Sequence, residues 1–76
     1  MDPDNATAYA DRGITHGIVG QLDDAIADFT KALELQPDLG EAYYNRGLAY
    51  EIKGDQPKAN SDFDMAKKYG FNHEDY

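Results

Sequence analysis

The side chains that could carry out chemistry in this chain are two histidines, fifteen carboxylates and a few hydroxyl groups. His16 and His73 do not have the spacing of a metal-binding pair, and the absence of cysteine removes thiolate ligands. Hydroxyl groups in turns or helices are not nucleophiles without a base positioned beside them, and no glycine-rich loop is present to hold a phosphate. We therefore expect no catalytic residue, no cofactor and no metal site, and we expect that the protein is not an enzyme.

Two arginines, Arg12 and Arg46, are each followed at the same distance along the chain by an aspartate. These aspartates are Asp28 and Asp62. A planar guanidinium can bind a carboxylate through two parallel hydrogen bonds, so arginine is well suited to partly buried ion pairs. A bridge between neighbouring helices explains the repeated pair better than a catalytic or ligand-binding role, because structural networks also hold charged groups.

The two pairs belong to a longer internal repeat, because the chain matches itself when it is shifted by 34 residues. The residues that coincide are Ala8-Tyr9 with Ala42-Tyr43, Arg12-Gly13 with Arg46-Gly47, Gly20 with Gly54, Ala25 with Ala59, Asp28-Phe29 with Asp62-Phe63, and Ala32 with Ala66. A fixed period of this length is typical of stacked repeat units and not of a single globular core. Stacked helical repeats mostly hold other proteins.

Each repeat is expected to contain two helices, because apolar residues recur at three- and four-residue spacing and no segment alternates with period two. Capping side chains at Asp4-Asn5 and at Asp55, and Pro37 after the second helix, mark the helix ends. The expected helices run from near Ala6 to Gly20, from about Asp23 to Gln36, from Gly40-Glu41 to Lys53-Gly54, and from Asp55 to about Tyr69-Gly70. The sequence therefore predicts an all-α fold of two stacked antiparallel helical hairpins.

The composition narrows the classes of partner. Seventy-six residues form one small domain at most, without room for a deep catalytic cleft. The net charge of −8 disfavours nucleic acid, whose phosphates require Lys and Arg, and suits basic or mixed-charge partners. No apolar run approaches the roughly 20 residues needed to cross a bilayer, and no secretory signal follows Met1. We expect a cytoplasmic protein that binds neither nucleic acid nor membranes.

Aromatic and small residues recur in both units at positions that should meet between two helices. They belong to the series Tyr9, Arg12, Gly13, His16, Ala25, Phe29, Ala32 and Pro37 in the first unit and Tyr43, Arg46, Gly47, Tyr50, Ala59, Phe63 and Ala66 in the second. This pattern resembles the tetratricopeptide repeat (TPR), and the resemblance covers residues 6 to about 70. It departs from the family where Arg12 and Arg46 replace a leucine-like residue and where Phe71 replaces a closing proline. The resemblance implies a fragment of an α-solenoid.

Small residues are expected to bring the two helices of each hairpin together. Gly47 has no β-carbon, so it should meet Ala59 of the partner helix at close range. Gly13 and Ala25 should meet in the same way in the first unit. Large aromatic rings such as Phe29 should fill the space around the contact.

The resemblance also implies a binding site for a protein or peptide. In this family the first helix of each unit lines a concave face, and side chains at helical spacing form one stripe on each of these helices. The expected partner-binding residues are Asp11, Ile14, Ile18, Glu41, Tyr44, Asn45, Leu48, Glu51 and Ile52. A peptide with aliphatic side chains and one or two basic residues fits this stripe. Asn45 is not accompanied by a lysine, so an acidic C-terminal tail is not the expected ligand.

The pattern divides the chain into residues 1–5, a remnant of a preceding repeat or an N-terminal cap; residues 6–39 and 40–70, the two repeats; and residues 71–76, a C-terminal tail. The outward positions of the last helix are polar where those of the second helix are apolar, which is typical of a terminal capping unit. Leu33, for example, corresponds to Lys67. Phe71 and Tyr76 could cover the apolar surface that remains.

Two functions are compatible with these observations. The first is a protein–protein interaction module, a scaffold or adaptor, that binds a peptide or partner protein on its concave face. The alternative is a self-assembly or structural module that oligomerises through its uncapped repeat face. In that case we expect a closed homodimer through the first helix, because only that face is apolar and uncovered.

Overall fold

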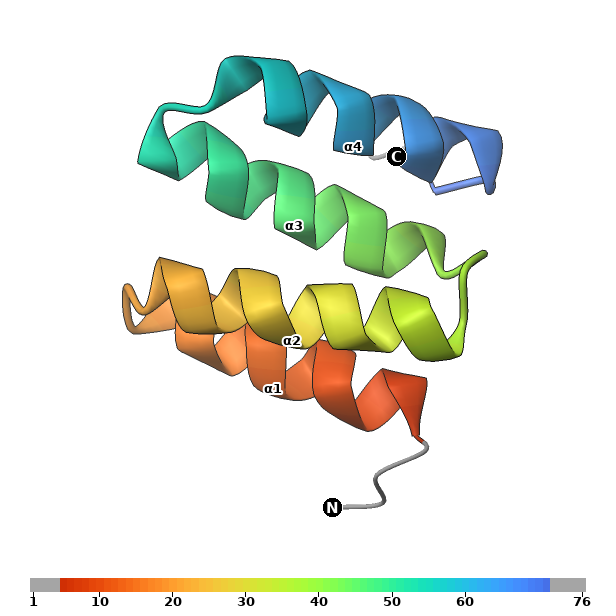
Figure 1. Ribbon diagram of the computed structural model, residues 1–76, viewed down its shortest axis with the longest axis horizontal. Coiled ribbons are helices and arrows are strands. Elements are labelled where there is room, and N and C mark those ends of the chain that lie inside the picture. Colours follow the sequence, from red (N-terminus) through yellow and green to blue (C-terminus); the bar gives the residue numbers. More distant parts are fainter. Residues whose placement is uncertain (1–4, 72–76) are drawn as a thin grey trace.

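The computed structural model describes residues 5–71, which form two antiparallel helical hairpins (Figure 1). The helices are α1 (Ala6–Ile18), α2 (Leu22–Leu35), α3 (Gly40–Lys53) and α4 (Gln56–Lys68). Helices α1 and α2 pack together as the first hairpin, α3 and α4 as the second, and α2 lies against α3 (Figure 1). Residues 5–71 contain no strand. The all-α fold of stacked hairpins that the periodicity predicts is confirmed.

The ends of the helices follow from capping side chains and glycines. The Asn5 side chain accepts a hydrogen bond of 3.1 Å from the backbone N–H three residues later, at the start of α1. Asp55 does the same at 3.3 Å for α4. Gly20 and Gly54 follow α1 and α3 with φ of +84° and +89°, a left-handed conformation that glycine adopts without a steric penalty. These ends lie within two residues of those predicted.

Helix α2 begins and ends one residue earlier than the sequence suggests. It starts at Leu22, one position before Asp23, and no side chain caps it. It ends at Leu35, which is two positions before Pro37 and one position before the expected end, Gln36. The residue before a proline is excluded from the α conformation, so the helix stops ahead of it.

The two helices of each hairpin meet at a glycine, with an aromatic ring of the second helix against it. A β-carbon on Gly47 would come within 2.7 Å of Phe63 Cε1, and the nearest atom of Ala59 is its carbonyl oxygen, at 3.2 Å. A β-carbon on Gly13 would likewise come within 2.7 Å of Phe29 Cε1. Gly47 and Ala59 therefore meet at close range as predicted, through the backbone of Ala59, and the Phe63 ring one turn later packs against the same glycine.

The hairpins stack through a small apolar core. Phe29 is the largest fully buried side chain of residues 5–71, and the partly buried Leu39 and Tyr43 pack against the same cluster. The buried members of this cluster are Ala6, Ala10, Ala25, Phe29, Ala32, Leu33 and Ala42. Most of them are alanines, so the helices can approach closely and a short chain still forms a tight interior.

The C-terminal end of the second hairpin is closed by Phe71. Its backbone N–H donates a 2.8 Å hydrogen bond to the Ala66 carbonyl, and its β-carbon lies beside the buried Gly40. The outward positions of α4, including Asn60 and Lys67, are exposed, whereas Leu33 at the equivalent place in α2 is buried. This agrees with a polar terminal face. The predicted N-terminal remnant apart from residue 5, and the tail residues 72–76, lie outside the described residues.

Candidate functional site

The repeated arginines and aspartates form the ion pairs that their spacing predicts. Arg12 Nε and Nη2 donate to the two Asp28 carboxylate oxygens at 2.8 and 2.6 Å. Arg46 makes the same two bonds to Asp62, both at 2.8 Å. The hydrogen bonds to these carboxylates raise the pKa of both arginines, so the guanidinium groups stay charged. Each pair ties the two helices of one hairpin together.

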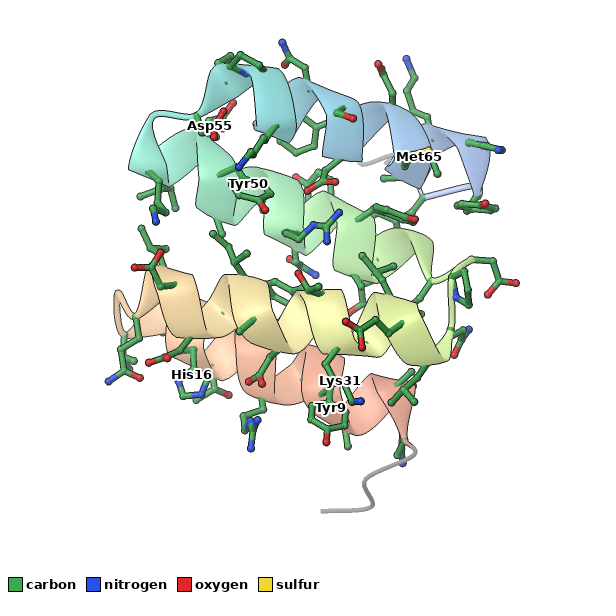
Figure 2. The ribbon with its side chains drawn as sticks, viewed as in Figure 1. Tyr9, His16, Lys31, Tyr50, Asp55 and Met65 are labelled. Atoms are coloured by element: carbon green, nitrogen blue, oxygen red, sulfur yellow. The ribbon has the colours of Figure 1, made fainter. Side chains whose placement is uncertain are left out.

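His16 extends the ion-pair network of the first hairpin. Its Nδ1 is 2.7 Å from Gln21 Oε1, and its Nε2 is 3.5 Å from Asp28 Oδ2. Figure 2 shows His16 and Tyr9 along the same edge of α1, well apart from each other. Within residues 5–71, no three His, Cys, Asp or Glu side chains gather as metal ligands.

A groove of about 190 Å³ opens between α1 and α3. Helix α1 contributes two small and two aliphatic residues, α3 contributes a mixture of aliphatic and polar residues, and two side chains of α2 complete the lining. These residues are Gly13, Ile14, Gly17, Ile18, Leu22, Phe29, Asn45, Leu48, Ala49 and Ile52. We call this feature the α1–α3 groove.

Five of the nine predicted partner-binding residues line the groove, namely Ile14, Ile18, Asn45, Leu48 and Ile52. Ile18 and Ile52 occupy equivalent positions of the two repeats and are 79% and 70% exposed. Both side chains therefore present aliphatic surface to solvent beside the groove.

The polar groups of the predicted stripe lie around the groove or turn back to their own helix. Asn45 Nδ2 donates to the Glu41 carbonyl at 3.0 Å, so this amide is held along α3. Asp11, Glu41 and Glu51 are exposed and do not line the groove. Their carboxylates are exposed on α1 and α3, the two helices on either side of the groove.

Tyr44 is the remaining one of the nine predicted partner-binding residues. Its ring packs within the second hairpin. Its ring centroid is 5.7 Å from that of Phe63 and 5.1 Å from that of Phe71. The side chain is half-buried, and it is not part of the groove lining. The sequence could not show this because Phe71 follows the last helix and reaches Tyr44 only through the fold.

The groove includes residues that the sequence analysis did not assign to it. Gly13 and Gly17 lie one turn apart on α1 and line the groove, with the Phe29 ring against Gly13. Leu22 and Phe29 reach it from α2. The sequence feature that could have indicated Gly13 and Gly17 as lining residues is their spacing. They are four residues apart, next to Ile14 and Ile18, and residues four apart share one helix face.

None of the described helices has the length and apolar character needed to cross a membrane. The comparisons with known proteins agree with the repeat pattern. A family model described as TPR repeat matches residues 19–54, which cover α2, the link between the hairpins and α3. No curated protein matches the chain.

Proposed function

We propose that this chain, which carries a tetratricopeptide repeat over residues 19–54, is a protein–protein interaction module that binds a partner segment in the α1–α3 groove. TPR repeats generally mediate interactions between proteins and are a non-catalytic fold. The single observation that carries the assignment of the site is the exposure of Ile18 and Ile52 beside an open apolar groove.

The lining of the groove supports an aliphatic ligand. The side chains of Ile14, Leu48 and Ile52 offer apolar surface, and no charged residue is part of the lining. Apolar area removed from water stabilises a complex by about 25 cal/mol per Å² before the costs of association. A partner that inserts one or two aliphatic side chains would cover both exposed isoleucines.

The charges near the groove support a basic component in the same ligand. Asp11, Glu41 and Glu51 are exposed on the two helices that line the groove, and the whole chain carries a net charge of −8. Acidic groups around an apolar site favour encounter with basic segments and disfavour acidic ones. We therefore expect a peptide in which aliphatic residues are interspersed with Lys or Arg.

The test is selection of peptides from a random library on the chain, followed by affinity measurements with Ile18→Asp and Ile52→Asp. Both variants should weaken the selected peptides at least tenfold, because each places a carboxylate against the apolar contact. Val19→Asp is the matched control, since Val19 is 63% exposed beside Ile18 but does not line the groove. If Val19→Asp weakens binding as much as Ile18→Asp does, the site lies elsewhere.

A further inference from the structure

The face of α1 that carries Arg12 is the repeat equivalent of the face of α3 that α2 covers. On α3, Arg46 Nη1 donates a 3.1 Å hydrogen bond to Thr30 Oγ1 across the junction between hairpins, and the Arg46 side chain is only 19% exposed. Arg12 binds Asp28 in the same way, but within residues 5–71 its Nη1 donates no hydrogen bond, and its side chain is 52% exposed. Arg12 therefore has the same partner within its own hairpin as Arg46, but within residues 5–71 it lacks the further contact that Arg46 makes to the neighbouring hairpin.

Helix α4 corresponds to α2 in the repeat register, but Asn60 and Lys67 stand on α4 where α2 has Ile26 and Leu33. A shift of 34 residues carries Thr30 of α2 onto Asp64 of α4, and Asp64 is exposed. A second copy placed on α1 as the first hairpin lies on α3 would therefore bring Asp64 opposite Arg12. A carboxylate is a stronger acceptor for a guanidinium than a hydroxyl, so the shifted contact is an improved one.

A second contact between the hairpins, an ion pair, is replaced by two uncharged residues after the same shift. Inside the chain, Lys53 of α3 forms an ion pair with Asp23 of α2. The shifted positions are Val19 and Pro57, both of which are exposed. Both charges are replaced together, so the contact between copies would be apolar and would leave no charge without a partner.

We propose that copies of this chain stack head to tail, with α4 of one copy against α1 of the next, joined by Arg12 with Asp64 and by Val19 with Pro57. The surface is separate from the α1–α3 groove, so the proposal does not depend on peptide binding. Lys67 stands on α4 where the buried Leu33 stands on α2, which makes the junction between copies weaker than the internal one. Because the two faces differ, the contact does not close on itself and chains lengthen with concentration.

Sedimentation velocity over a concentration series separates this arrangement from other modes of association. The Asp64→Lys variant should weaken self-association roughly tenfold, because it replaces an attractive pair with a repulsive one. The control is Asp38→Lys, an exposed position in the link between hairpins with the same change in charge. Both variants lower the net negative charge, so general repulsion alone predicts stronger association for both. Asp64→Lys associating like Asp38→Lys overturns the proposal.

A gain-of-function variant covers the case in which the natural junction is too weak to observe. Val19→Lys combined with Pro57→Asp recreates between copies the ion pair that Lys53 and Asp23 make inside the chain. The double variant should form chains longer than dimers at concentrations where each single variant does not. If the chain forms a discrete dimer whose affinity is unchanged by Asp64→Lys, the association would instead be a two-fold pairing of α1 faces. A double variant that stays monomeric also overturns the proposal.

Discussion

Gly13 in α1 lies directly against the ring of Phe29 in α2, so that a β-carbon on Gly13 would stand 2.7 Å from Phe29 Cε1. The Phe29 ring is almost fully buried, with alanines of α1, α2 and α3 in the same core cluster. A methyl group on Gly13 would therefore require the ring or the helix to shift, and the present distance between the helices of the first hairpin depends on its absence.

The first prediction is that Gly13→Ala destabilises the protein whereas Gly17→Ala, one turn later, does not. At Gly13 the added methyl overpacks the contact with Phe29, and we expect a loss of about 1–2 kcal/mol in the free energy of unfolding. At Gly17 the new β-carbon would stand 4.0 Å from Ala25 Cβ, which is ordinary contact. Alanine is also the better helix former, so Gly17→Ala should stabilise by up to about 1 kcal/mol. Urea denaturation checks both, and equal effects would contradict the close approach at Gly13.

The second prediction concerns the coupling between Arg46 and Asp62. Replacing either residue alone leaves a charged group partly buried without its partner, so Arg46→Met and Asp62→Leu together should cost less than the sum of the single changes. We expect a coupling energy of about 1–3 kcal/mol from a double-mutant cycle measured by chemical denaturation. The same cycle on Arg12 and Asp28 should give a smaller coupling, because water reaches Arg12 more freely. A larger coupling in the first hairpin would contradict this argument.

The third prediction is that Tyr44→Ala destabilises the folded protein. Its ring contacts both Phe63 and Phe71, so its removal should lower the free energy of unfolding by about 1–3 kcal/mol. The control is Tyr44→Phe, which keeps the ring and should lose less than half as much. Thermal unfolding followed by circular dichroism measures both variants. A normal melting temperature for Tyr44→Ala would indicate that the contacts with Phe63 and Phe71 contribute little.

The fourth prediction tests the acidic surroundings of the groove. For a basic peptide selected on the chain, Glu51→Lys should weaken binding several-fold at low salt and much less at high salt, because exposed charges are screened. Asp38→Lys makes the same change in net charge away from α1 and α3 and should have a smaller effect. Isothermal titration at two ionic strengths measures the difference. A salt-independent loss of affinity would point to a direct contact with Glu51 and not to long-range attraction.

The sequence alone determined the helices and their order, because caps, glycines and the 34-residue period are local features that act through the backbone. It also predicted the two ion pairs, since Arg12 and Arg46 each recur with an aspartate at the same spacing, and both pairs form in the structure.

Tertiary structure decided which side chains share space. Gly47 meets the ring of Phe63 and the backbone of Ala59, and the Tyr44 ring packs against the ring of Phe71. The groove likewise required Leu22 of α2 to lie beside α1 and α3. Helical periodicity assigns a residue to a face but does not say how far a neighbouring ring extends across that face. The difference arises because backbone preferences are encoded within a few positions, whereas packing depends on the volumes of side chains that only the fold brings together.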